Sequence, residues 1–239
     1  MAANNSDRLA VLIDADNAQA SVLTELLAEV SKYGSASVKR AYGDWTTPNL
    51  KGWKAHLQKH AIQPIQQFSF ATGKNATDSA LIIDAMDLLH SGQLDGFCLV
   101  SSDSDFTRLA TRLRESGVAV YGFGEHKTPE PFVAACDRFV FTEILRPEPP
   151  QTTKPSKPIG APLEKIIVPA VEACAREDGW AHLSAVGHII LKTHSSFDPR
   201  NYGYSKLGEL VRHQPYLDVS EITSKDAAPI LLIRVKAKR

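Results

Sequence analysis

The sequence predicts an α/β protein in which a domain with a mostly parallel central sheet is followed by a smaller C-terminal domain. Three observations predict this organisation. Up to about residue 145, short apolar runs rich in β-branched side chains alternate with stretches of helical periodicity. Residues 146–162 then hold six prolines and almost no apolar side chains. The remaining residues have the patterns of three helices followed by two strands.

The alternation in the first part predicts its strands and helices in turn. Strands are expected over 9–13, 36–42, 62–67, 96–101, 117–121 and 138–142. Helices are expected between them, over about 18–33, 49–60, 77–90, 105–115 and 130–136. Such alternation implies a mostly parallel sheet with helices on both faces. The first and fourth runs are the most continuously apolar, which is typical of central strands buried on both faces. The segment YGFGEH at 121–126 contains a GxG without a third glycine, and we interpret it as a turn after the fifth strand.

The second part predicts a small winged-helix-like module. An amphipathic helix begins near Pro162 and is expected to end near Gly179. Two further helices follow over 182–194 and 205–213, and strands are expected over 216–222 and 228–239. A proline-rich segment stays extended and forms no core, so it separates two folded units. The predicted domains are therefore 1–146 and 162–239, joined by a linker at 147–161.

Composition narrows the class of protein. The chain has 239 residues, of which 43% are hydrophobic and 23% charged, as in ordinary globular proteins. It has neither an apolar run long enough to span a membrane nor the pattern of a signal peptide, so we expect a cytoplasmic protein without membrane contact. Its three cysteines have no zinc-binding spacing. Residues 1–150 carry 14 Lys and Arg against 18 Asp and Glu, whereas residues 151–239 carry 13 against 9. An acidic half joined to a basic half suits a metal site coupled to a polyanion-binding module.

Acidic side chains follow the two most apolar runs. Asp14, Asp16 and Asn17 come directly after the first run, and Asp103 and Asp105 after the fourth. Ligands of parallel α/β sheets bind beyond the carboxyl ends of the strands, so both groups belong at one edge, and they converge if the two strands are neighbours. Helical geometry adds Asp78, which lies on the sheet-facing side at the start of the helix predicted over 77–90.

Such a group of carboxylates needs a compensating cation. Hard oxygen ligands of this kind, completed by water, suit Mg²⁺ or Mn²⁺ and metal-assisted phosphoryl chemistry. Helix capping is the alternative for Asp78, Asp103 and Asp105 taken singly. Asp84 lies about 240° around the helix from Asp78, so this geometry does not place it at the metal.

Several motifs in the first part of the chain resemble those of a known family. LIDADN, TDSALIIDAMDLL and GFCLVSSDSDFTRLATRLRESGVAVYGFG are similar to the motifs of the NYN domain, the LabA-like branch of the PIN-like nucleases, over about residues 7–145. The resemblance implies a PIN-like Rossmannoid sandwich and a metal-dependent ribonuclease. It implies site roles for Asp14, Asn17, Asp78, Asp103 and Asp105, with Asp16 less certain because its position varies between branches. Asp84 also matches a motif but remains a secondary candidate.

The second part, from about residue 160, resembles the OST-HTH (LOTUS) domain, with DPRNYGYSKLGELV the most telling segment. This resemblance implies RNA binding or, in some members, protein binding. Cations interleaved with aromatic rings can contact phosphates and stack on bases. We therefore predict a nucleic-acid-binding set drawn from both domains: Arg40, Trp45, Lys74, Arg200, Tyr202, Tyr204 and Lys206. The alternative for Tyr202 and Tyr204 is simple packing against the third helix of this domain.

The predicted function is a Mg²⁺- or Mn²⁺-dependent (endo)ribonuclease with a C-terminal RNA-binding module; the sequence does not distinguish endonucleolytic from exonucleolytic cleavage. RNA, single-stranded or structured, is the expected partner. An RNA-binding adaptor without turnover is the alternative. A third interpretation, a haloacid-dehalogenase-like phosphatase suggested by Asp14-x-Asp16, is disfavoured because DADNAQ lacks the usual Thr or Val after the second Asp.

Overall fold

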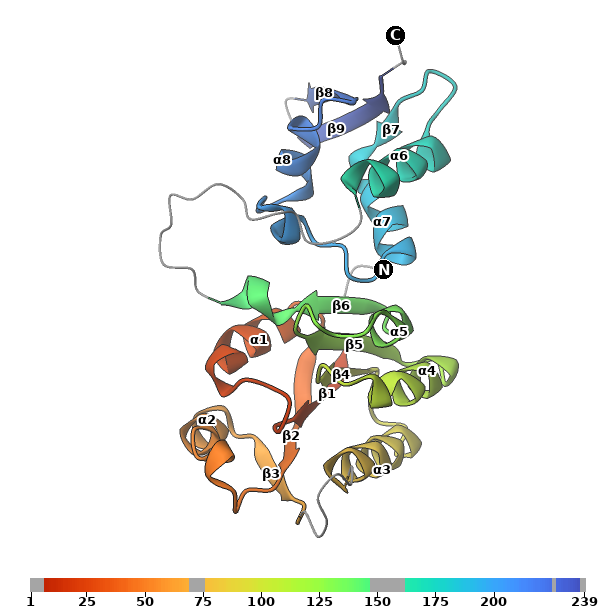
Figure 1. The fold of residues 1–239 in the computed structure, drawn as a ribbon. Helices are drawn as coiled ribbons and strands as arrows, with labels where there is room; N and C mark the ends of the chain where they lie inside the picture. Colours follow the sequence, from red (N-terminus) through yellow and green to blue (C-terminus); the bar gives the residue numbers. More distant parts are fainter. Residues whose placement is uncertain (1–6, 69–75, 147–161, 225–226, 237–239) are drawn as a thin grey trace. The chain divides into compact units, whose positions relative to one another are not determined.

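The computed structural model describes residues 7–68, 76–146, 162–224 and 227–236 (Figure 1). The chain divides into two compact units, Met1–Glu148 and Pro149–Arg239. The predicted linker at 147–161 lies outside the described residues.

The first unit is built on a six-stranded sheet in the order β3-β2-β1-β4-β5-β6, and every neighbouring pair is parallel. Its strands are β1 Arg8–Asp14, β2 Ser35–Gly43, β3 Gln63–Gln66, β4 Gly96–Val100, β5 Ala119–Gly124 and β6 Arg138–Phe141. The two most apolar strands, β1 and β4, are paired at the centre, and all of β4 is buried. The predicted α/β class with a parallel sheet is confirmed.

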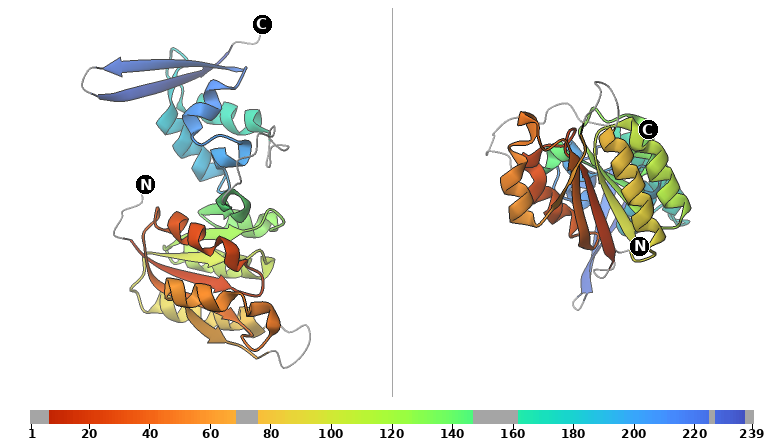
Figure 2. Two further views of the ribbon diagram at one scale, coloured as in Figure 1. Left: turned by 90° about the vertical axis from the view of Figure 1, so that its left-hand side faces the viewer. Right: turned by 90° about the horizontal axis from the view of Figure 1, so that it is seen from below.

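Helices cover both faces of this sheet (Figure 2). The α-helices are α1 Leu23–Val30, α2 Trp53–His60, α3 Ala76–His90, α4 Thr107–Glu115 and α5 Glu130–Ala135. Short 3₁₀ turns flank them: η1 Ala20–Val22, η2 Pro48–Leu50, η3 Ser104–Phe106 and η4 Thr142–Leu145. Helices α1 and α2 pack with Val11, Ile13 and Val100 on one face. Helices α3, α4 and α5 pack with Leu12, Phe97 and Leu99 on the other. Alternate strand residues thus feed two separate apolar layers.

The fifth strand differs from the expectation. It begins at Ala119 and runs through Gly124, so the GFG segment is strand and not a turn. A β-carbon on Gly122 would lie 2.4 Å from Cδ2 of Phe139 and 2.7 Å from Sγ of Cys136. A β-carbon on Gly124 would lie 2.6 Å from the carbonyl oxygen of Ser101. At these glycines the absence of a side chain lets packed neighbours approach the strand closely. In the sequence alone, the same glycines look like those of a turn.

We expect Gly122→Ala to lower the free energy of unfolding by about 2 kcal/mol, because Phe139 and Cys136 are buried and cannot yield freely. Urea denaturation followed by circular dichroism measures this change. Gly52→Ala is the matched control, since its φ is −63° and no atom lies within 4 Å of the added carbon. Equal unfolding midpoints for wild type and Gly122→Ala would contradict the packing argument.

In the described residues of the second unit, three α-helices and one short 3₁₀ turn accompany a three-stranded antiparallel sheet in the order β7-β9-β8. Its elements are α6 Leu163–Cys174, β7 Ala181–His182, α7 Leu183–Thr193, η5 Pro199–Tyr202, α8 Leu207–Arg212, β8 Leu217–Ser224 and β9 Ala227–Val235. The helices and the β8–β9 hairpin follow the prediction, whereas α6 ends earlier, at Cys174. A turn closes after it, where Gly179 has a φ of +79°. Among the described helices of both units, none has the length and apolarity to cross a membrane.

Candidate metal centre and nucleic-acid interface

The pairing of β1 with β4 places their carboxyl ends side by side. Ile13 is in register with Val100, so the next residues, Asp14 and Ser101, emerge together. Helix α3 packs against β1, and Asp78 lies in its first turn. The segment after β4 enters η3, which carries Asp105 and is preceded by Asp103. Three separate segments therefore reach one edge of the sheet.

Asp14 is fully buried and held by two neighbours. Its Oδ2 accepts hydrogen bonds from Ser101 Oγ and from Asn17 Nδ2, both at 2.8 Å. Its Oδ1 accepts a longer hydrogen bond of 3.3 Å from the backbone N–H of Asn17. Burial raises the pKa of Asp14, and the bonds from Asn17 and Ser101 oppose that rise. Asn17 and Ser101 thus fix the orientation of this carboxyl group.

Asp103 combines a structural role with its place at the edge. Its Oδ1 accepts a 2.9 Å bond from the Asp105 amide and caps η3. Its own amide donates to Ser101 Oγ at 3.1 Å. The capping alternative left open by the sequence therefore describes one oxygen of Asp103 correctly.

The structure brings Asp78, Asp103 and Asp105 together. One carboxylate oxygen from each lies within 4.8 Å of the other two. The pKa of Asp78 is raised to about 6, first by burial and then by the negative charges of Asp14, Asp103 and Asp105. Carboxylates this close repel one another, and an oxygen-binding divalent cation relieves that repulsion. The donor set therefore fits Mg²⁺ or Mn²⁺.

Asp16 and Asp84 lie elsewhere around this centre. Asp16 Oδ2 accepts a 3.1 Å bond from Thr77 Oγ1, which ties the loop after β1 to the start of α3. Asp84 accepts hydrogen bonds from the Arg40 guanidinium and the Tyr42 hydroxyl on β2. Burial, followed by the bond to Asp84, raises the pKa of Tyr42. Asp84 is thus engaged by Arg40 and Tyr42 of β2, a contact that the helical geometry of the sequence did not predict.

The nucleic-acid residues predicted in the first unit have mixed surroundings. Arg40 is paired with Asp84, and only 26% of its side chain is exposed. The Trp45 indole donates to the carbonyl oxygen of Ile65 at 3.0 Å, and its ring meets Trp53 edge-on at 6.4 Å. Lys74 lies outside the described residues. Arg40 and Trp45 are therefore held by intramolecular contacts.

The residues predicted in the second unit are also partly engaged. Arg200 forms a two-pronged pair with Asp198, with Nε–Oδ1 and Nη2–Oδ2 distances of 2.9 and 2.8 Å. Tyr202 is buried, with its ring 5.9 Å from that of Phe197. The Tyr204 ring lies 5.1 Å from the His213 ring, and Lys206 is exposed. Tyr202 and Tyr204 therefore pack against neighbouring side chains, whereas the charged group of Lys206 faces solvent.

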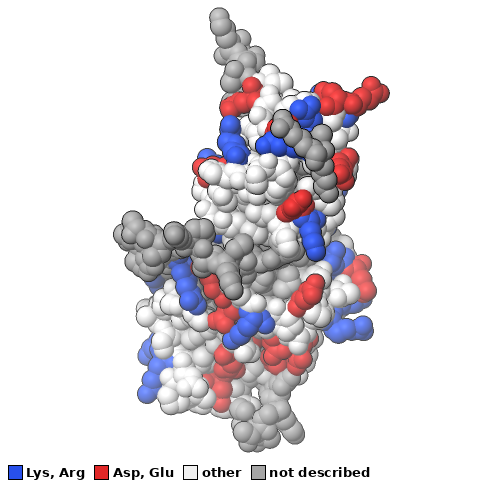
Figure 3. All heavy atoms as spheres, turned by 45° about the horizontal axis from the view of Figure 1, so that its top comes forward, with Lys and Arg blue, Asp and Glu red and all other residues white. Residues whose placement is uncertain are grey.

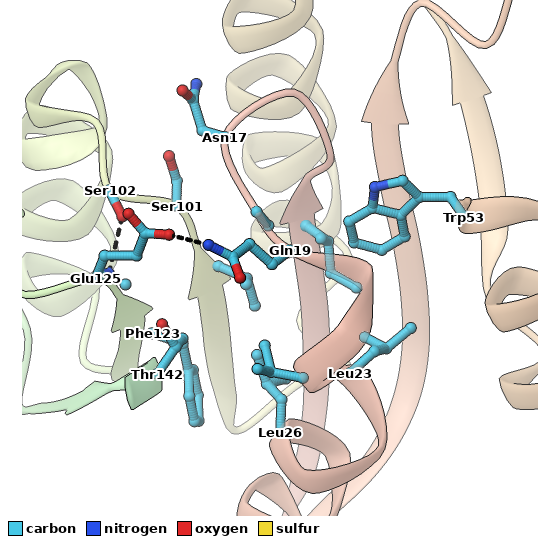
Figure 4. Close-up of a pocket in the computed structure, with 15 residues that line it drawn as sticks. Asn17, Gln19, Leu23, Leu26, Trp53, Ser101, Ser102, Phe123, Glu125 and Thr142 are labelled. Atoms are coloured by element: carbon cyan, nitrogen blue, oxygen red, sulfur yellow. Dashed lines mark hydrogen bonds between the residues drawn. The ribbon is translucent and has the colours of Figure 1, made fainter. Parts of the chain in front are cut away.

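The sequence reasoning missed Ser101 and a pocket beside it. Ser101 continues from β4, and the serines of SSDSDF were the available signal. The pocket lies on the α1 face of the sheet and includes Gln19, Ser102 and Glu125 (Figure 4). On the face in Figure 3, acidic and basic side chains of the described residues are interspersed and form no broad field of one sign.

Two known domain families match this chain. The NYN domain model matches residues 8–145, and the OST-HTH/LOTUS domain model matches residues 155–226. Curated proteins give no match.

Solved structures with similarity include a protein of unknown function from Vibrio parahaemolyticus. It is 17% identical, with 58% of this chain and 94% of that chain covered and a TM-score of 0.49. An uncharacterised protein from Nitrosomonas europaea is 27% identical over 39% of this chain and 92% of its own, with a TM-score of 0.32. A protein from Chromobacterium violaceum is 38% identical over 36% of this chain and 91% of that chain, with a TM-score of 0.28.

Proposed function

Because this chain belongs to the NYN domain family and carries an OST-HTH/LOTUS domain after it, we propose that it is a metal-dependent ribonuclease with an attached RNA-binding module. One observation carries the proposal. Asp78, Asp103 and Asp105 come from two segments and converge within 4.8 Å at the carboxyl edge of a parallel sheet. Helix capping accounts for one oxygen of Asp103 and leaves the convergence unexplained.

The proposed ligands of Mg²⁺ or Mn²⁺ are Asp78, Asp103 and Asp105, with Asp14 beside them. A bound divalent ion polarises a phosphodiester and lowers the pKa of a coordinated water. The chain's own residues prepare the place for this chemistry. Asn17 and Ser101 hold the buried Asp14 carboxyl group, and Asn17 lies exposed at the edge, where its amide can orient a water or a phosphate oxygen.

The second domain is proposed to hold the RNA. Lys206 is exposed at the start of α8, where its ammonium group can contact a phosphate. Arg200 and Tyr204 belong to the same proposed surface, but their contacts with Asp198 and His213 limit how their side chains can contact RNA. Binding through phosphates is salt-dependent and carries little sequence preference.

The test incubates labelled single-stranded RNA with the purified chain in Mn²⁺, in Mg²⁺ and in EDTA. Asp103→Asn runs beside wild type after a thermal melt has established that it folds. We expect cleavage in metal, none in EDTA, and a rate at least about a hundredfold lower in the variant, since a ligand of the centre is lost.

Two other outcomes would contradict the nuclease proposal or its assignment to the acidic centre. Metal-insensitive RNA binding without cleavage in any metal would overturn the nuclease proposal in favour of the non-catalytic adaptor. Equal cleavage by Asp103→Asn would assign the activity to a contaminant or to another site.

A further inference from the structure

Two exposed arginines on α4, Arg108 and Arg112, have almost no compensating negative charge within reach. Among the described residues, the Arg108 side chain has no ion-pair or hydrogen-bond partner. Nη1 of Arg112 lies 4.0 Å from Oε2 of Glu115, and 56% of the Arg112 side chain is exposed. A pair this long and this solvated holds the guanidinium group only weakly. Both positive charges are therefore available to a ligand.

The position of these two charges opposes the stability of the helix that carries them. Arg108 is the second residue of α4, and the helix dipole disfavours a cation in the first turn. Arg108 and Arg112 are also four residues apart, so their like charges repel each other across one turn. Solubility would be served equally well by charges of either sign at these positions. An anionic ligand, in contrast, gives a reason for two cations here.

Helical geometry places both arginines on the flank of α4 that faces α3. On the opposite flank, Arg114 faces α5, since its Nε lies 3.0 Å from Oδ1 of Asp137 and its Nη1 donates to the carbonyl oxygen of Ala135 at 3.2 Å. Arg112 lies about 200° around the helix from Arg114, and Arg108 lies about 40° from Arg112. Helix α3 lies beside α4 on the same face of the sheet (Figure 1).

This α3-facing flank begins at the acidic centre. The 3₁₀ turn η3 carries Asp105 and leads directly into α4, and it also contacts α3, whose first turn carries Asp78. From there α4 runs away from the carboxyl edge of the sheet. Arg108 and Arg112 are separated by about 6 Å along the helix axis, which is comparable to the spacing of successive phosphates in a nucleic-acid strand.

We propose that Arg108 and Arg112 form a phosphate-binding track along which the RNA strand leaves the acidic centre. With the scissile phosphate at the acids, the next phosphate on one side contacts Arg108 and the one after it contacts Arg112. The inference rests on the proposed function and deepens it by giving the path of the strand. Both arginines are positioning residues, because the phosphates that they hold do not react.

The first test measures how salt weakens RNA binding. Fluorescein-labelled octauridylate is titrated with the full chain in Ca²⁺, and its affinity is measured by fluorescence anisotropy at several KCl concentrations. Loss of one phosphate contact with a single strand lowers the slope of log affinity against log salt by about 0.7. Arg108→Met and Arg112→Met should each lower it by this amount, and the double variant by about 1.4. Arg108→Lys should retain the wild-type slope, because a lysine releases the same counterions.

Arg114→Met is the matched control for charge. It makes the same change on the opposite flank of the same helix and should leave the salt slope unchanged. Thermal melts establish that each variant folds, and Arg108→Gln replaces Arg108→Met if the latter does not. Phosphate contacts made by the second domain are common to all variants and cancel in the comparison.

The second test follows cleavage of the same octauridylate in Mn²⁺. Because the track holds the strand equally in the ground state and in the transition state, its loss should raise KM and leave kcat within about twofold of wild type. We expect about a threefold rise in KM for each single variant and about a tenfold rise for the double variant, as for exposed charge pairs. A purely structural role would change the melting temperature and not this ratio.

An unchanged salt slope in the double variant, an equal loss in Arg114→Met, or no measurable binding by wild type would overturn the track. The first of these results is also expected if Arg108 serves only to offset repulsion among the acids. Metal-dependent cleavage would then still support the nuclease function. A lowered slope without cleavage in any metal would instead overturn the nuclease function and leave the track standing.

Discussion

Asp78→Asn is expected to make the metal-free protein more stable and to remove its stabilisation by Mn²⁺. The pKa of Asp78 is raised from 3.8 to about 6 by burial and by its acidic neighbours. A group whose pKa is higher in the folded chain favours folding while it is protonated. Its contribution is complete below about pH 4 and is lost as the pH rises through about 6. At pH 7.5 the ionised side chain therefore opposes folding, and the isosteric amide does not.

The gain is modest because Asp78 is only partly buried and solvent screens its charge. We expect about 1 kcal/mol, or a rise of about 2–4 °C in melting temperature, without metal at pH 7.5. No gain is expected at pH 4. Differential scanning calorimetry in EDTA across this pH range measures the effect.

Metal reverses the order of the two proteins. A ligand at a hundred times its Kd stabilises the folded chain by about 2.7 kcal/mol, and wild type should show a shift of this size with Mn²⁺ at pH 7.5. The shift should shrink at pH 5, because binding must then displace a proton from Asp78. Asp78→Asn should show almost none of it.

Asp87→Asn is the matched control, since it makes the same chemical change at an exposed position of the same helix. It should leave both the metal-free stability and the Mn²⁺ shift unchanged. Lower metal-free stability of Asp78→Asn would contradict the argument that ionised Asp78 opposes folding. An unchanged Mn²⁺ shift in this variant would show that Asp78 has no role in metal binding.

The second large effect is expected from Arg40→Met, which removes the cation that pairs with Asp84 between β2 and α3. The two side chains are 26% and 21% exposed. Removing one partner of a fully buried pair costs about 3–5 kcal/mol. Because this pair is partly solvated, we expect a loss of about 2 kcal/mol, measured by urea denaturation.

A double-mutant cycle with Asp84→Leu separates the pair from other effects of the substitutions. Coupling of at least about 1 kcal/mol is expected, since removal of both charges leaves no uncompensated ion. Arg112→Met, at an exposed position of α4, should cost little. The Mn²⁺ shift should persist in Arg40→Met because Asp84 is not a member of the converging acidic group.

This experiment also examines the predicted RNA contact of Arg40. A variant with weakened RNA binding and unchanged stability would support that contact and contradict the structural role. Reduced stability with unchanged RNA affinity would assign Arg40 to the fold alone.

Much of the first unit could be predicted because its signals are local. The apolar runs around β1 and β4 are short and continuous, and strands buried on both faces require such runs. Helical periodicity placed Asp78 on the sheet-facing side of α3, and it also placed Asp84 away from the acidic centre. Both positions depend only on 100° of rotation per residue.

Other features depend on neighbours that are distant in the chain. In the sequence Gly122 looks like part of a turn, but in the structure Phe139 and Cys136 pack against it within a strand. In the sequence Tyr202 looks like a base-stacking residue, but in the structure it packs in the core beside Phe197. Glu125 carries no motif, and its place opposite Gln19 arises only because β5 lies next to β4 in the sheet.

The sequence by itself determined the alternation of strands and helices, the two-domain organisation and the acids that end the two most buried strands. Only the tertiary structure decided that these strands are neighbours, that Ser101 and Asn17 hold Asp14, and that Asp78, Asp103 and Asp105 converge. The reason is physical. Periodicity and capping act over a few residues, whereas strand order and the distances between carboxylates follow from the packing of the whole sheet.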